Sequence, residues 1–369
     1  MSRRGSAKVA VAGDSSASAD PPISHLSVHE LGEGRLEPGL PNGRPQRLLR
    51  IDVTGAPPNL LGRLLVGSYI TGQDQVLITG RDGLSADQRA EVRRAADRLL
   101  GMTVVGDTAG SVEVQNFVDP GKHELPHLLH RVVQMLRAEL SACAAALAGG
   151  EVRRLLVVGD IEQEVDRFYI LMVRQLLLSS DDPRIARSID VESHHYQIGD
   201  RMVAKVLEVV GDLIYGISTD LQAALPALRR EAPGVVRELE TRVLRLDRLL
   251  FGSMAAFVQL SIVEANGILN DLAERIPTDS AYGQEIARQV HDRHAAVASQ
   301  RIACSLDMAL EMLVIINEVT INRGVEPVFE IPTGSRSKPN VRTNHSRLAS
   351  SQTDVSILTQ KGQKRSRRA

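Results

Sequence analysis

The sequence predicts a mainly α-helical protein in which a small α+β module precedes two tandem three-helix bundles. Aromatic residues make up only 3% of the 369 residues and tryptophan is absent, so the core must consist of Leu, Val, Ile and Ala. Helical periodicity begins near Lys122 and continues for about 200 residues. Short strand-like runs occur before that point, between Leu48 and Val118. This order favours one mixed module followed by helices.

The α+β module is predicted over residues 47–119 with the order βαβαββ. Ser85 has the residue type of a helix N-cap, and Gly101 follows the same helix as a stop signal. Each of the two helices carries one apolar stripe, so both must cover one face of the sheet. The predicted strands and helices are, in order, 48–53, 59–72, 74–80, 85–101, 102–107 and 111–118.

Five or six long helices are expected after the module, in runs that divide into two sets of similar total length. The divisions occur at residues 181–184, Pro226, Pro233 and 276–280, where proline interrupts the pattern or a turn sequence occurs. We therefore predict a first bundle over 120–218 and a second over 219–324. The runs are 123–149, 152–179, 188–217, 233–276 and 280–323.

Both ends of the chain have the composition of disordered arms. Residues 1–46 are rich in Ser, Gly, Pro and Ala without periodicity, and residues 325–369 are similar but basic. From Ile331 onward there are nine Lys or Arg against one acid, whereas the whole chain has a net charge of −1. A protein that binds nucleic acid over its whole surface is therefore not expected, although the tail could contact phosphates.

Several classes of protein are excluded by the residues that are missing. Two cysteines, Cys143 and Cys304, cannot form a disulfide framework or a four-cysteine zinc module, and both have the context of small core residues. There is no signal-peptide pattern and no run of 18 apolar residues, so we expect a cytoplasmic protein without membrane insertion. Phosphate-binding glycine loops, nucleophile elbows and a Ser, His and Asp set are also missing, which argues against an enzyme.

The strongest chemical signal is a pair of acids in the stretch GDIEQEVDRFY. Glu162 and Asp166 are four residues apart, so they project from one face of a helix and can share a cation. Asp200 lies on the next long helix, which folds back, and we expect it beside them. Three carboxylates without cysteine form a hard oxygen site that suits Mg, Mn or Fe better than Zn. The alternative is a solvated acidic face with ordinary ion pairs.

Three stretches of the chain carry a resemblance to a known family. Residues 63–120, the segment EQEVDRFYILMVRQL at 162–176 and the last helical run at 299–323 resemble the PhoU-domain regulators of phosphate uptake. The resemblance extends from about Leu48 to Arg323, and EVDRFYILMVRQL is its most specific part.

The resemblance implies two three-helix bundles with acidic metal clusters. The family's acidic motif, Glu or Asp followed four positions later by Asp, matches Glu162 and Asp166. Its third-helix motif, ERxxDHxxN, is partly kept when Asp200 is aligned with the motif's Asp. In the second bundle Glu264 is the best remaining acid. The implied metal is Fe, Mn, Mg or Zn. Residues 1–46 lack the AbrB-like DNA-binding pattern that often opens such proteins.

The function implied by the resemblance is that of a non-enzymatic cytoplasmic regulator that lowers phosphate uptake and phosphate-starvation signalling. The implied partners are the ATPase of a phosphate ABC transporter and a sensor histidine kinase, and the implied assembly is a homodimer. An alternative is a transcriptional regulator of phosphate genes that contacts DNA through its N-terminal or basic C-terminal arm. A di-iron enzyme is disfavoured because the required Glu-x-x-His pairs are missing.

Overall fold

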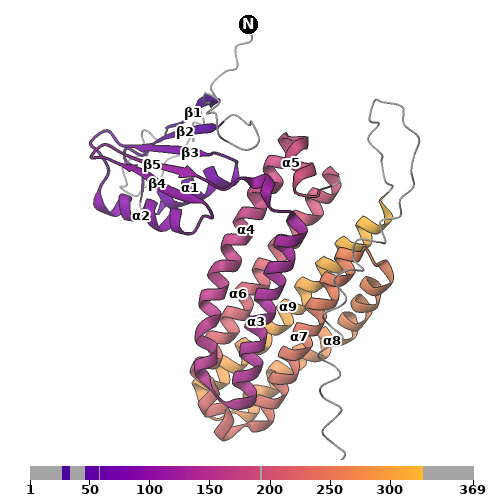
Figure 1. Cartoon of the computed structure of the whole chain (residues 1–369). Coiled ribbons are helices and arrows are strands. Elements are labelled where there is room, and N and C mark those ends of the chain that lie inside the picture. Colours follow the sequence, from indigo (N-terminus) through magenta and orange to yellow (C-terminus); the bar gives the residue numbers. More distant parts are fainter. Residues whose placement is uncertain (1–26, 34–45, 58, 192, 327–369) are drawn as a thin grey trace, which may run out of the picture. The chain divides into compact units, whose positions relative to one another are not determined.

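The computed structural model describes residues 27–33, 46–57, 59–191 and 193–326 (Figure 1). Within these residues the protein is mainly helical, with one small sheet module at the N-terminal side. This confirms the predicted fold class at the level of a helical protein preceded by an α+β module.

The module is a five-stranded sheet whose spatial order is β1-β2-β3-β5-β4. β2 and β3 are parallel and joined by α1, and the other neighbours are antiparallel. Alternate residues such as Val76, Ile78 and Val112 are buried with Leu65 of α1 and Val92 of α2, so both helices cover one face as predicted (Figure 1). The elements are β1 (Ser27–Glu33), β2 (Arg47–Asp52), α1 (Leu60–Ile70), β3 (Gln75–Thr79), α2 (Ala86–Asp97), β4 (Met102–Asp107) and β5 (Ser111–Asn116).

The predicted N-cap and stop signal of α2 are both confirmed. The Ser85 hydroxyl accepts a hydrogen bond from the Gln88 N–H, and the Gln88 side chain accepts one from the Ser85 N–H, which forms a capping box. After α2 the chain reaches Gly101, whose φ of 83° lies in the left-handed region. A Cβ atom there would collide with Val118, so glycine is required by conformation and by space.

One strand lies where the sequence predicted disorder. β1 falls within the 1–46 arm and pairs antiparallel with β2, so the prediction is wrong for Ser27–Glu33. Edge strands pair through backbone hydrogen bonds, and the stretch SVHELGE lacks the apolar alternation by which a strand is recognised in a sequence. Residues 1–26 and 34–45, with the rest of that prediction, lie outside the described residues.

The remaining described chain forms helices that share one hydrophobic core (Figure 1). α3, α4 and α6 pack on one another, as do α7, α8 and α9, but α6 also packs along α9 and α3 along α7. The two predicted sets therefore do not have separate cores. The elements are η1 (Pro120–Lys122), α3 (Leu125–Gly149), η2 (Val152–Val157), α4 (Val158–Asp181), α5 (Pro183–Ser188), α6 (His194–Glu231), α7 (Pro233–Gln259), α8 (Ile262–Gln289) and α9 (Arg293–Val325).

Three predicted divisions of the helical region are wrong. The boundary at 218/219 lies inside α6, which continues through Pro226, and the break at 276–280 lies inside α8. Pro226 is exposed, while Leu225 and Leu228 on either side of it are buried. Apolar packing on both sides of the proline holds the helix together, although the proline removes one backbone donor. The predicted tail, 325–369, lies outside the described residues beyond Glu326.

Among the described residues, α3 is the one helix with the length and hydropathy of a membrane span. Half of its apolar window is buried, and its buried side chains pack against the other helices in the shared core. Contacts within the protein therefore account for its apolar composition.

The module is attached to the helices by Arg174 of α4, whose side chain is 1% exposed. Its guanidinium donates to the carbonyl oxygens of Tyr69 and Gln73 and to Oδ1 of Asp74, at 2.7 Å. It also stacks over the Tyr69 ring, 4.7 Å from the ring centroid. A buried arginine with this many acceptors fixes one point of contact between the module and α4.

Candidate metal centre

α4 and α6 form an antiparallel pair whose register determines which acids meet. The Gln197 amide donates to the Ser179 hydroxyl near the turn, and Gly211 lies against Val165. Asp166 is therefore opposite the neighbourhood of residue 211. The acid that the structure brings there is Asp212.

Glu162, Asp166 and Asp212 form a carboxylate cluster in which one ligand atom of each lies within 4.8 Å of the others. Glu162 and Asp166 are partly buried and Asp212 is exposed. The predicted pairing of Glu162 with Asp166 on one helix face is confirmed. The cluster is thus open to solvent on its α6 side, which gives a cation a route of entry.

The placement of Asp200 beside this cluster is wrong. Asp200 is 12 residues before Asp212 on α6, which is about 18 Å along a helix. It is 4% exposed, and its Oδ1 accepts from Nη1 of Arg323 at 2.9 Å. Burial raises its pKa to about 6 even though Arg323 opposes that shift. Asp200 belongs to an ion pair between α6 and α9.

Glu264 also lies apart from the cluster. It is exposed in the first turn of α8, where its N–H donates to the Ser261 hydroxyl that caps the helix. An acid in this position interacts favourably with the helix dipole. Among the described residues, no group of three potential metal ligands includes it. The structure therefore gives Glu264 a capping environment without companion ligands.

A fourth acid, Glu139 of α3, lies in the core near enough to Glu162 to interact with its charge. Its side chain is 0% exposed, and neither carboxylate oxygen has a hydrogen-bond partner. Burial, and then the nearby charge of Glu162, raise its pKa to about 9. The sequence signal was available, because Leu136, Glu139 and Leu140 share the core-facing side of α3. A buried acid without a partner is costly unless something else compensates it.

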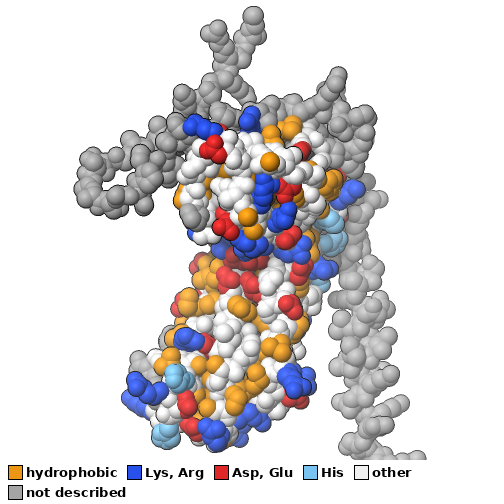
Figure 2. Space-filling model, turned by 90° about the vertical axis from the view of Figure 1, so that its left-hand side faces the viewer, with side chains coloured by type: hydrophobic (Ala, Val, Ile, Leu, Met, Phe, Trp, Pro, Cys, Tyr) orange, Lys and Arg blue, Asp and Glu red, His pale blue; other side chains and the backbone are white. Residues whose placement is uncertain are grey.

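The cluster carries more negative charge than its neighbours neutralise. Burial, followed by Asp166 and Asp212, raises the pKa of Glu162 to about 7, and burial also raises the pKa of Asp166. Nη2 of Arg98, at the end of α2, donates to Oδ2 of Asp166 at 3.0 Å. Figure 2 shows acidic side chains of the helices beside basic ones of the module. A cation would relieve the repulsion that remains.

Glu208 extends the acidic group along α6. Its pKa is raised by burial, and Asp212 and Asp166 add to that shift, while an ion pair with Lys205 opposes it. Among the described residues, the potential ligands that cluster here are carboxylate oxygens. Oxygen donors alone fit Mg²⁺, Mn²⁺ or iron better than Zn²⁺, which prefers nitrogen and sulfur. The burial of Glu139 and Glu162 differs from the solvated acidic face considered as the alternative.

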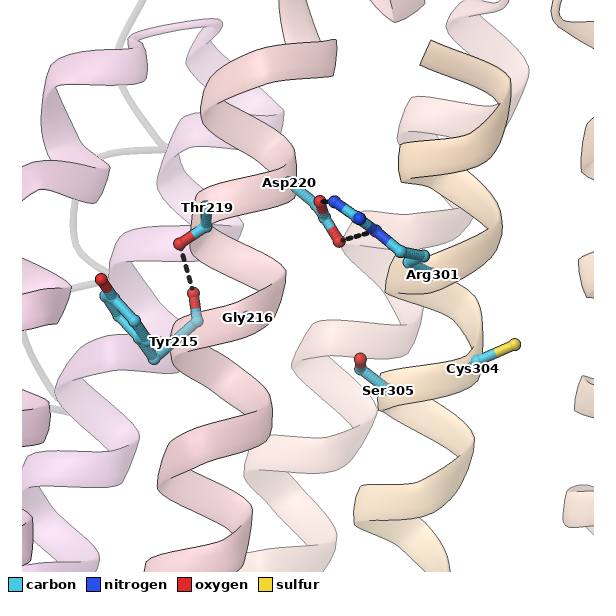
Figure 3. Close-up of a pocket in the computed structure, with 7 residues that line it drawn as sticks. All are labelled: Tyr215, Gly216, Thr219, Asp220, Arg301, Cys304 and Ser305. Carbon is cyan, nitrogen blue, oxygen red and sulfur yellow. Dashed lines mark hydrogen bonds and ion pairs between the residues drawn. The ribbon is translucent and has the colours of Figure 1, made fainter. Parts of the chain in front are cut away.

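A groove between α6 and α9 is the second feature of interest (Figure 3). It encloses about 490 Å³, and Asp220 and Arg301 point toward each other across it with Arg301 Nε 3.0 Å from Asp220 Oδ2. Cys304 is exposed, so its assignment as a core residue is wrong, whereas Cys143 is buried as predicted. In Figure 3 the Cys304 thiol points away from Asp220. Asp220, the acid of this groove, is already neutralised by Arg301.

The chain matches no model of a known protein family, no curated protein and no solved structure.

Proposed function

We propose that this chain is a non-enzymatic regulator of phosphate uptake of the PhoU type, with a metal ion held between α4 and α6. The observation that carries the proposal is the convergence of Glu162, Asp166 and Asp212 next to the buried, unpartnered Glu139. When bound, Mn²⁺, Mg²⁺ or iron would supply positive charge that holds α4 and α6 together. The protein's own contribution is to position the carboxylates and to exclude water on the Glu139 side.

The register of α4 and α6 supports the proposed family. The motif ERxxDHxxN requires Glu and Asp four residues apart, and Glu208 and Asp212 have that spacing in EVVGD. This alignment replaces the one that used Asp200, and its Asp212 is the acid that lies with Glu162 and Asp166. Val209, Leu213 and Gly216 stand where the motif has Arg, His and Asn, so this alignment keeps only its two acids and the donor set is all oxygen.

An exposed apolar stripe on α7 supports a role in protein contacts. Leu244, Phe251 and Val258 follow one another at seven-residue intervals, and about half of each side chain is exposed. Side chains at this interval lie on one helix face and can receive a helix of another protein. The proposed partners are the ATPase of a phosphate ABC transporter and a sensor histidine kinase, and the proposed assembly is a homodimer.

The test compares phosphate uptake in cells that carry different versions of the chain. Deleting the protein should raise uptake in phosphate-rich medium, and the wild-type chain should lower it again. Glu162→Gln with Asp166→Asn should fail to do so. Asp160→Asn with Glu164→Gln, on the same helix but outside the cluster, is the matched control and should behave as wild type.

Equal uptake with and without the protein would contradict the proposed function. Full restoration by the Glu162 and Asp166 double variant would instead separate the regulatory role from the metal centre.

The alternative of a DNA-contacting regulator stays a prediction, because the basic tail and most of the N-terminal arm lie outside the described residues. A gel shift that weakens steeply with salt and disappears after removal of residues 334–369 would support it.

A further inference from the structure

Two of the charged contacts between the α+β module and α4 differ in burial. The first is Arg174, enclosed among Tyr69, Gln73 and Asp74. The second is the ion pair of Arg98 with Asp166, in which the Arg98 side chain is 67% exposed. Asp166 precedes Arg174 by eight residues, which is about 12 Å along a helix. The buried Arg174 contact is therefore the permanent attachment. The exposed Arg98–Asp166 ion pair is the exchangeable attachment, because water can replace it.

The exchangeable attachment ends on a carboxylate of the candidate metal centre. Asp166 Oδ2 accepts from Arg98 Nη2 at 3.0 Å, and Asp166 is also one of the three clustered acids. The same guanidinium lies close enough to Glu162 to interact with its charge. Arg98 thus occupies the place of a counter-ion for the cluster. A metal ion that uses Asp166 must share or displace it.

We propose that Arg98 and a metal ion compete for Asp166, so that metal binding releases the end of α2 from α4 while Arg174 keeps the module attached. This rests on the proposed metal centre and adds its means of regulation. An exposed arginine–carboxylate pair contributes little to stability, so a coordinated cation can replace it. Release would leave the Arg98 guanidinium in solvent, where it is already mostly exposed.

Contacts inside the module determine how far the end of α2 can move when Arg98 leaves Asp166. The Tyr69 hydroxyl donates to the Leu100 carbonyl at 2.8 Å, just after Arg98, and the Tyr69 ring lies under Arg174. The end of α2 is therefore tied to the same residue that contacts the permanent attachment. Without the Arg98 contact, the module stays held to α4 by Arg174, by Ile170 in the module's core and by the Arg47–Asp181 ion pair, while the end of α2 loses its contact with Asp166. The surface that α2 and α4 present jointly to a partner would then depend on metal.

The first test measures Mn²⁺ binding to the full chain by titration calorimetry. Arg98→Gln should tighten Mn²⁺ binding by about 3- to 10-fold, because the competing charge is removed. Arg94→Gln is the matched control, since Arg94 lies one turn earlier on the same helix and is exposed. It should leave the dissociation constant unchanged.

The second test measures hydrogen exchange with and without Mn²⁺. In the wild type, Mn²⁺ should speed exchange in the last turn of α2 and the residues up to Leu100, while the segment around Gln73 and Asp74 stays protected. Arg98→Gln should show the faster exchange without metal. Since the measurement follows the backbone, it does not depend on any activity of the protein.

Two results would overturn the proposal and can be told apart. If wild type and Arg98→Gln bind Mn²⁺ equally well, or exchange at α2 is the same with and without Mn²⁺, the competition is wrong but the metal centre stands. If neither protein binds Mn²⁺, the metal centre fails and the competition with it.

Discussion

Two regions of α6 show how the counter-ion determines what an acid can do. Asp212 and Asp220 are eight residues apart on this helix. Asp220 is buried and paired with Arg301 of α9, so its charge is balanced within the fold. Asp212 faces Glu162 and Asp166, and Arg98 forms its ion pair with Asp166. An acid with a structural role, such as Asp220, is neutralised by an arginine of its own. Among the described residues, the three acids of the candidate metal centre have one arginine, Arg98, beside them.

The largest expected effect concerns a buried acid deprived of its arginine. Arg174→Met should destabilise the protein by about 3–5 kcal/mol, because Asp74 would be left charged and buried. Urea unfolding followed by circular dichroism measures the loss. A change in the free energy of unfolding below about 1 kcal/mol would show that water solvates Asp74 in the variant. The Arg174 site would then be less buried than described.

The next largest effect is expected at Glu139, a buried acid whose carboxylate oxygens have no hydrogen-bond partner. Glu139→Gln should stabilise the metal-free protein by about 2–3 kcal/mol at pH 7. The folded-state pKa of Glu139 is raised from 4.5 to about 9, so its contribution is fully present below pH 4.5 and is lost as the pH rises toward 9. Unfolding measured from pH 4 to 9 should show the two proteins converging at low pH. A constant difference would contradict the shifted pKa.

Two matched substitutions test the contrast between Asp220 and the acids of the candidate metal centre. Asp220→Asn should cost about 1–3 kcal/mol, since it weakens a charge-assisted pair with Arg301. Asp166→Asn in metal-free protein should change stability by less than about 1 kcal/mol, because lost repulsion offsets the lost Arg98 contact. Both are measured by urea unfolding with a chelator present. Equal losses would remove the distinction between the two regions.

The smallest effect is expected at Glu264. Glu264→Gln removes a carboxylate from the exposed first turn of α8 and should cost less than about 0.5 kcal/mol. Metal content should not change. A loss of bound metal in this variant would mean that a second centre forms around α8, contrary to the placement of Glu264 described above.

Much of the fold could be predicted because its signals are local. The capping box at Ser85 and the apolar stripes of α1 and α2 are properties of neighbouring residues. β1 was missed because its pairing with β2 is a long-range backbone contact. The continuation of α6 through Pro226 was missed because buried leucines on both sides, visible only after packing, outweigh the local effect of proline.

The candidate site was half predictable for the same reason. Glu162 and Asp166 are recognised by helix periodicity alone. Choosing Asp212 rather than Asp200 requires the register of α4 on α6, which the contact of Ser179 with Gln197 sets near the turn. Counting back from that contact leads from Asp166 to residues near 211. Arg98 could not be found by periodicity, since it comes from a different module.

The most direct test of the account is the metal content of two variants purified without a metal-binding tag. Asp212→Asn and Asp200→Asn differ in position by three turns of one helix, and each replaces a carboxylate with an amide of the same shape. Mass spectrometry should find metal in wild type and in Asp200→Asn but not in Asp212→Asn, with circular dichroism confirming that both variants are folded. Metal retained in Asp212→Asn, or lost only in Asp200→Asn, would contradict the centre between α4 and α6.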